Sequence, residues 1–277
     1  MAKVISFLNY KGGVGKSTTT VNVAKALHDM GHKVLVIDTD SQANSSKLMG
    51  KRLSEGNEKT LYEAMTKNVP IEECIFMDQE KEDSFDFVPS NQNMVYAEME
   101  LVSKIGRESV LRKAIQPVRN YYDFILIDCT PADGLISQNA ITASDYILVP
   151  LNGEPFAVDG MGKIIQRYRE VKENVNENLQ LLGYVFTLTR KCSLHDATKD
   201  MLKEQREKRG WPGEIFKSEI KQNVRLAETA AFYTNIFDYA ETFNKKDIKD
   251  RSKWESAMSA AEQYKELAAE LIEKLNG

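Results

Sequence analysis

The segment Lys11-Gly12-Gly13-Val14-Gly15-Lys16-Ser17-Thr18 decides the fold of this chain. It follows the apolar run Val4 to Leu8, which is typical of a buried parallel strand, and it precedes a segment with helical periodicity. Glycines let the backbone curl so that successive N–H groups face an anion, and the start of the next helix adds its positive dipole. The pattern therefore predicts a phosphate-binding loop between a strand and a helix.

Two side chains at the end of this loop have the chemistry that a bound nucleotide requires. Lys16 is placed to neutralise the β and γ phosphates, and the hydroxyl of Ser17, one residue on, is placed to ligate Mg²⁺. The loop thus predicts a nucleotide-binding set that consists of Gly12, Gly13, Val14, Gly15, Lys16, Ser17 and Thr18.

Two later apolar runs deliver carboxylates. Val34 to Ile37 is followed by Asp38 and Asp40, and the run from Asp123 ends in Asp128. Because ligands of an open α/β sheet bind at the carboxyl ends of its strands, these acids are expected beside the loop. A carboxylate there holds Mg²⁺ through water or accepts from an attacking water. We therefore expect Asp128, and also Asp40, to act on the metal through water.

Composition limits the class of protein. The 277 residues carry a formal charge of −4 and the sequence pI is about 5.6, so DNA binding would need a local basic patch. Cys74, Cys129 and Cys192 match neither a metal-binding spacing nor a disulfide framework, which fits a reduced, intracellular setting. The sequence has no basic-then-apolar leader and no apolar run long enough to cross a bilayer. We expect a soluble, cytoplasmic protein without membrane contact.

The elements alternate as in an α/β fold, a mostly parallel, doubly wound sheet with helices on both faces, and residues 1–277 are expected to form one domain. Further strands are expected at Phe85 to Val88, Tyr146 to Leu151 and Leu181 to Leu188. Helices are expected from Lys16 to Met30, from Thr60, over Met94 to Ile115, over Leu194 to Arg209 and over Trp254 to Leu275.

The string Lys11 to Thr18 resembles the deviant Walker A motif of the ParA/MinD family of P-loop ATPases, most closely that of Soj-like ParA partition proteins. Similar segments are Asp38 to Asn44, Phe87 to Asn91, Ala97 to Leu101, Glu154 to Met161 and Ile220 to Glu228. The resemblance implies a Mg²⁺-dependent ATPase with Lys11, Lys16 and Asp40 as catalytic residues. In the family the lysine at the Lys11 position reaches the phosphates of the other subunit, which implies an ATP-dependent sandwich dimer.

The resemblance also implies partners. Family members of the partition branch bind DNA non-specifically on the nucleoid and are released when a ParB-type centromere-binding protein stimulates ATP hydrolysis. Basic side chains on the C-terminal side meet the DNA backbone, and Lys217, Lys221 and Arg225 are the tentative counterparts here. For Arg225 the alternative is an ion pair with Glu228, three residues along a helix. The resemblance further places Asn223 at the nucleotide.

The chain departs from the family at five positions. Ser41 and Ala43 stand where proline and glycine are usual, which is expected to change the mobility of that loop and the basal hydrolysis rate. Cys129 replaces a threonine, and a small buried side chain is its expected role. Lys221 and Gln222 stand where Pro-Arg is usual near the adenine, so contact with the base is expected to differ.

Residues 243–253 look like an insertion relative to the family, and their mixed charges indicate a solvated loop. A separate hypothesis is that the lysines and arginine of this segment extend the basic surface to which Lys217, Lys221 and Arg225 are assigned. Two other functions remain open. One is a membrane-associated positioning ATPase like MinD, although the acidic helix at 254–275 disfavours anionic lipid. The other is an enzyme that uses the same loop to phosphorylate a small carboxylate, as some cofactor-synthesis ligases do.

Overall fold

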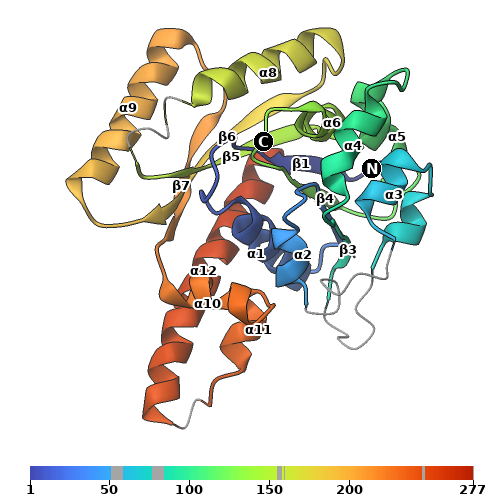
Figure 1. The fold of residues 1–277 in the computed structure, drawn as a ribbon. Coiled ribbons are helices and arrows are strands. Elements are labelled where there is room, and N and C mark those ends of the chain that lie inside the picture. The colour runs from blue at the N-terminus through green and yellow to red at the C-terminus, as the bar shows by residue number, and fades with distance from the viewer. Residues whose placement is uncertain (51–58, 77–83, 155–157, 159, 245–246, 277) are drawn as a thin grey trace.

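The computed structural model describes residues 1–50, 59–76, 84–154, 158, 160–244 and 247–276. Its centre is a seven-stranded sheet in the order β3-β2-β4-β1-β5-β6-β7, and all neighbouring strands run parallel (Figure 1). The strands are β1 (Lys3–Phe7), β2 (Val34–Asp38), β3 (Asp86–Val88), β4 (Phe124–Asp128), β5 (Tyr146–Asn152), β6 (Gln180–Thr189) and β7 (Glu214–Lys221). The predicted parallel sheet is confirmed.

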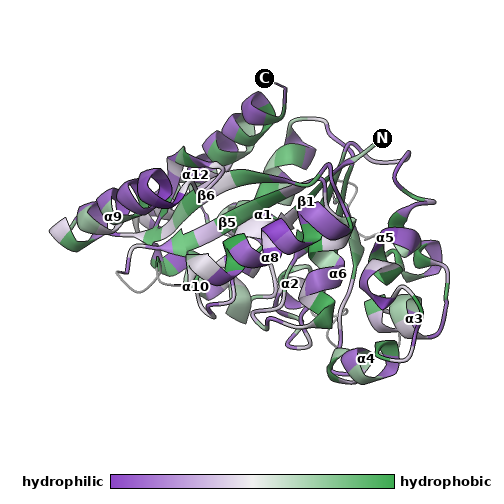
Figure 2. Ribbon diagram, turned by 90° about the horizontal axis from the view of Figure 1, so that it is seen from above, coloured by the Kyte–Doolittle hydropathy of each residue, from purple (hydrophilic) through white to green (hydrophobic). Residues whose placement is uncertain are grey.

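Helices cover both faces of this sheet. They are α1 (Lys16–Asp29), α2 (Asn44–Leu48), α3 (Leu61–Thr66), α4 (Met94–Leu101), α5 (Val110–Ile115), α6 (Leu135–Ala143), α8 (Met161–Asn174), α9 (Ser193–Arg209), α10 (Val224–Ala231), α11 (Ile236–Glu241) and α12 (Ile248–Asn276). The sheet is covered on both faces because successive residues of its strands are apolar and point to opposite sides. In β1, Val4 belongs to the core beneath α3 to α6 and α8, whereas Ile5 belongs to the core beneath α1, α11 and α12. Figure 2 shows apolar residues along strands such as β5 and β6, and many hydrophilic residues along helices such as α8 and α9.

Local sequence signals set several helix ends. Thr60 and Glu63 form the capping box that begins α3: the Thr60 amide donates to Glu63 Oε2 at 2.8 Å, and the Thr60 hydroxyl accepts from the Tyr62 amide at 3.3 Å. α1 ends before Gly31, whose φ of +90° suits the left-handed turn that terminates a helix. Both of these predicted boundaries are confirmed.

The predicted loop at 243–253 is wrong from Ile248 onward, because the last helix begins there and not at Trp254. The mixed charges reflect helical pairs: Arg251 Nε lies 3.1 Å from Glu255 Oε1, and Lys253 Nζ lies 3.3 Å from Asp250 Oδ1. Lys245 and Lys246, which belong to the same predicted insertion, lie outside the described residues.

Helix α12 also packs on the sheet, as predicted, and protects its edge strand β7. Glu270 accepts from the amides of Lys217 and Ser218 at 2.9 and 2.8 Å, and Gln263 accepts from the amide of Lys221 at 2.7 Å. These side chains replace the ladder hydrogen bonds that a further strand would supply. Of the helices described, none is long and apolar enough to cross a membrane.

Candidate functional site

The loop after β1 has the backbone that its glycines predict. Gly13 and Gly15 have φ of +73° and +77°, in the left-handed region that a residue with a Cβ rarely adopts. Gly15 is the residue before α1, and because it has no side chain it cannot cap the helix. The first backbone amides of α1 therefore remain available to donate hydrogen bonds to an anion. The loop therefore has the geometry of a phosphate cradle.

Lys16, Ser17 and Asp128 come together at this loop. Lys16 is buried, its Nζ donates to the Lys11 carbonyl at 3.0 Å, and burial lowers its pKa while nearby Asp128 opposes that change. Asp128 is fully buried, and burial raises its pKa to about 6 against the opposing effect of the Ser17 and Ser45 hydroxyls. Asp128 Oδ1 has no hydrogen-bond partner among the described residues. A buried carboxylate oxygen without a partner, beside a hydroxyl, fits a Mg²⁺ ion held through water.

The segment after β2 is organised by Asp38. Its Oδ1 accepts from the Asp40 amide at 3.0 Å, and its Oδ2 accepts from the Ser46 amide at 2.9 Å. Asp40 is itself buried, and its carbonyl accepts from the Ser90 hydroxyl at 2.6 Å. The backbone of Asp40 is therefore fixed at both sides. No sequence pattern indicates this role of Asp38 beyond its place at the end of a strand.

The segments after β2 and β4 are joined by Thr39. Its hydroxyl donates to the Asp128 carbonyl at 2.8 Å and accepts from the Thr130 amide at 3.2 Å. Cys129 between them is buried, as predicted for a small side chain in place of threonine, and burial raises the pKa of its thiol to about 12. Among the described residues, no three His, Cys, Asp or Glu side chains form a direct metal cluster.

Lys11 extends away from the loop that contains it. Its Nζ lies 2.5 Å from Glu154 Oε2 and 3.4 Å from Asn152 Oδ1, at the end of β5. This arrangement leaves the loop's own phosphate position to Lys16. Residues 155–157 and 159, which belong to the predicted interface segment, lie outside the described residues.

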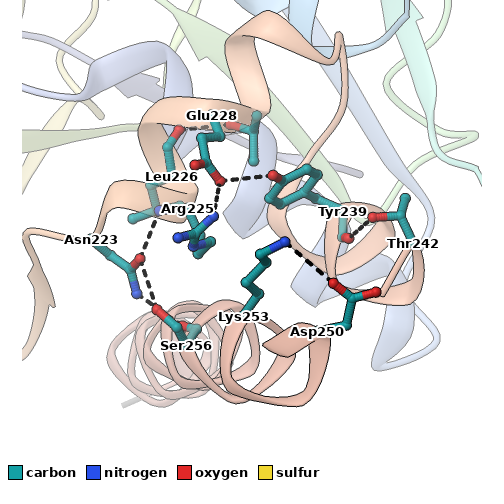
Figure 3. A network of polar contacts seen from close by, with 10 residues as sticks. Asn223, Arg225, Leu226, Glu228, Tyr239, Thr242, Asp250, Lys253 and Ser256 are labelled. Atoms are coloured by element: carbon teal, nitrogen blue, oxygen red, sulfur yellow. Dashed lines mark hydrogen bonds and ion pairs between the residues drawn. The ribbon is translucent and has the colours of Figure 1, made fainter. Parts of the chain in front are cut away.

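A cavity of about 550 Å³ extends from the loop toward the segment after β7. Gly13, Gly15 and Thr18 line one end, and Gln222, Asn223 and Tyr264 are among the residues that line the rest. The Asn223 amide also has partners within the protein: Oδ1 accepts from the Arg225 amide at 2.8 Å, and Nδ2 donates to the Ser256 carbonyl at 2.9 Å (Figure 3). Its contact with a nucleotide stays a prediction.

The three basic residues predicted to contact DNA do not share one environment. Lys217 and Lys221 are exposed on β7. Arg225 instead lies 2.5 Å from Glu228, which also accepts from the Tyr239 hydroxyl at 2.7 Å (Figure 3). The ion pair considered as the alternative for Arg225 is thus present, and contact with DNA stays a prediction for all three.

Comparison with known proteins agrees with this geometry. A family model described as an AAA domain matches residues 2–181. The chain is 33% identical to the sporulation initiation inhibitor protein Soj of Bacillus subtilis (strain 168) over 241 residues, which is 86% of this chain and 92% of Soj. It is 31% identical to the chromosome partitioning protein ParA of Myxococcus xanthus (strain DK1622) over 277 residues, 99% of this chain and 89% of that protein.

Among solved structures, cobyrinic acid a,c-diamide synthase from Mycobacterium smegmatis with bound ADP and magnesium is similar, with a TM-score of 0.73 and 27% identity. The match covers 84% of this chain and 91% of that one. A shared P-loop fold thus extends over proteins of different activity. The sequence relatives cover most of both chains, and on their evidence this chain belongs to the ParA/MinD family of P-loop ATPases.

Proposed function

We propose that this protein is a ParA-like partition ATPase. In this proposal ATP and Mg²⁺ close a sandwich dimer, the dimer binds DNA non-specifically on the nucleoid in the cytoplasm, and a ParB-type partner stimulates hydrolysis and releases it. The single observation that carries the proposal is the direction of Lys11, whose ammonium group lies at Glu154 and not in its own phosphate loop. The similarity to Soj and ParA supports the same function.

The chemistry follows from the positions of the side chains. Loop amides and Lys16 would bind the β and γ phosphates, and Ser17, with Asp128 and Asp40 through water, would hold Mg²⁺, which supplies charge neutralisation at the phosphates. Asp40 would orient the attacking water, since its backbone is fixed by Asp38 and Ser90. Lys11 would reach the partner subunit's phosphates, so hydrolysis removes a contact that exists only in the ATP dimer.

DNA binding requires a local patch because the chain as a whole is acidic. Lys217 and Lys221 are exposed and are therefore available to phosphates. Arg225 would need to exchange Glu228 for DNA, and since such a partly exposed pair contributes about 1 kcal/mol or less, the exchange is inexpensive.

The experiment that tests this function measures DNA binding of Asp40→Ala with ATP, with ADP and without nucleotide. We expect retention on DNA only with ATP, and its loss when Arg225→Glu is added. Lys16→Ala should lose nucleotide, whereas Lys11→Ala should bind nucleotide but not dimerise. DNA binding that ignores nucleotide, or normal dimerisation of Lys11→Ala, would contradict the proposal.

A second candidate is a small-molecule ligase, which the similarity to the M. smegmatis synthase favours. Phosphate release without any small substrate, raised by DNA and a partner, would exclude it. Vesicles in the same assay address the MinD-like alternative, and ATP-dependent vesicle binding in the absence of DNA binding would favour that function.

A further inference from the structure

The carboxylate of Asp128 is held by a hydroxyl group from a distant part of the chain. Ser45 Oγ donates to Asp128 Oδ2 at 2.6 Å, and both residues are fully buried. The backbone of Asp128 is fixed separately, because the hydroxyl and the amide of Thr39 donate to its carbonyl at 2.8 and 3.1 Å. With the backbone fixed, the direction of the carboxylate depends on the partner of Oδ2.

The two oxygens of this carboxylate differ in what they are free to bind. The bond from Ser45 is a charge-assisted hydrogen bond, which is shorter and stronger than a neutral one. Asp128 Oδ1, by contrast, has no hydrogen-bond partner in the part of the chain that the structure describes. The Ser17 hydroxyl also lies near this carboxylate, but it is the group placed to ligate Mg²⁺. Once the metal takes Ser17, Ser45 is the hydroxyl that remains to orient Asp128.

Ser45 is itself held in place by the short helix α2, which is bonded to two further strand ends. The amide and the hydroxyl of Ser46 donate to Asp38 Oδ2 at 2.9 and 2.8 Å, and the Ser46 hydroxyl accepts from the Ser90 amide at 3.0 Å. A helix of this length is not stable alone, so these contacts fix its position. The hydroxyl of Ser45 therefore has a defined place beside Asp128.

We propose that Ser45 is a positioning residue of the magnesium site, whose hydroxyl holds Asp128 so that Oδ1 faces the water bound to Mg²⁺. The inference rests on the proposed function, in which Mg²⁺ binds together with ATP. Groups that orient a metal-binding side chain govern metal affinity even though they do not touch the ion. Without the Ser45 hydroxyl, Oδ2 loses its partner and the carboxylate is free to turn away from the metal. Binding of the nucleotide alone does not depend on this contact.

The test measures the dissociation constant of a non-hydrolysable ATP analogue by calorimetry, once with Mg²⁺ and once with EDTA. The ratio of the two constants reports how much Mg²⁺ strengthens nucleotide binding. Ser45→Ala should lower this ratio by about tenfold, the usual effect of removing a group that orients a metal ligand. Its dissociation constant in EDTA should stay within about twofold of the unaltered protein, which also shows that the variant is folded.

Ser144→Ala is the matched control, because it removes the same group from another fully buried serine. Ser144 lies at the end of α6, and its hydroxyl donates to the Ala140 carbonyl at 2.8 Å. This variant should leave the ratio unchanged. A second comparison uses Asp128→Asn, in which the ratio should already be low. Adding Ser45→Ala should not lower it further, since Ser45 acts through Asp128.

The outcomes separate this inference from the proposed function. An unchanged ratio in Ser45→Ala, or a further loss when it is added to Asp128→Asn, would overturn the positioning role of Ser45 alone. An equal loss in Ser144→Ala would do the same, because the effect would then be a general one of a lost buried hydroxyl. Failure of the unaltered protein to bind the analogue in either condition would overturn the proposed function as well.

Discussion

Ala43 is a single residue whose backbone conflicts with its type. It has φ of +52° in the segment that follows Asp40, at the position where relatives are expected to have glycine. The left-handed conformation costs a residue with a Cβ about 1–2 kcal/mol, and replacement by glycine removes this cost. Part of the gain in stability is lost because glycine has more conformational freedom in the unfolded chain. Ala43→Gly should therefore raise the free energy of unfolding by about 0.5–1 kcal/mol, as measured by denaturant titration.

The control for this prediction is Ala114→Gly inside α5, which lacks a positive φ. It should lower the free energy of unfolding by about 1 kcal/mol, the usual cost of glycine in a helix. If Ala43→Gly destabilises the protein as much as Ala114→Gly does, the backbone of Ala43 does not lower the free energy of unfolding, and the prediction is wrong.

Residues of the phosphate loop were predictable because one short string fixes both their backbone and their chemistry. The string placed Lys16 and Ser17 at a helix start, where the structure has them. Asp38, Thr39 and Ser90 were not predictable in their roles, since each acts through a partner distant in sequence or through a backbone group. Such contacts depend on how two strands align, which no local pattern specifies.

Helix α9 packs on the sheet through His195. The residue is 4% exposed, and its ring packs edge-on against Phe186 with centroids 5.2 Å apart. Burial and nearby Lys199 lower the pKa of His195, whereas Glu219 and Asp196 oppose that change to a smaller extent. The charged form is therefore disfavoured in the folded protein.

The sign of the pH effect follows directly. Below the pKa of an unfolded histidine, about 6.5, the unfolded chain binds a proton that the folded chain resists, so stability falls as the pH is lowered. His195→Phe keeps a ring against Phe186 and removes the titration. The difference in free energy of unfolding between the two proteins should thus change in favour of His195→Phe from pH 8 to pH 5.5, measured by urea titration.

Other groups cancel in this difference. Asp38 and Asp128 have raised pKa values, about 8 and about 6, so they stabilise the folded chain as the pH is lowered, the opposite of the effect of His195. This contribution is the same in both proteins and drops out of the difference. His32→Phe serves as the control, because His32 is only half-buried. A pH-independent difference for His195→Phe would show that His195 does not titrate differently on folding.

Strands that consist of a continuous apolar run were predicted, and the strand that lacks such a run was not. The strands β1, β2, β4, β5 and β6 are apolar runs, and the sequence placed each within a few residues. The strand β7 was missed because its sequence, Glu-Ile-Phe-Lys-Ser-Glu-Ile-Lys, alternates charges and apolar residues without a continuous run. It is stable at the edge because Glu270 and Gln263 of α12 satisfy its amides, a tertiary effect.

The cavity that begins at the phosphate loop is lined by residues from both ends of the chain. Gly13 and Gly15 near the N-terminus line it, and so does Tyr264 of α12, which is buried in the core that contains Ile5 and Phe7 of β1. A ligand that binds there should stabilise the folded chain as a unit, because the cavity does not exist in the unfolded chain.

MgATP at 100 times its dissociation constant should raise the free energy of unfolding by about 2.7 kcal/mol, which calorimetry or denaturant titration can measure. Chelation of Mg²⁺ by EDTA at the same ATP concentration should remove most of this gain, since Asp128 would then face the phosphates with an oxygen that has no partner. Lys16→Ala should remove it with Mg²⁺ present. Equal stabilisation with and without Mg²⁺ would mean that Asp128 and Ser17 are not a metal site, because a bare carboxylate in that position repels the nucleotide.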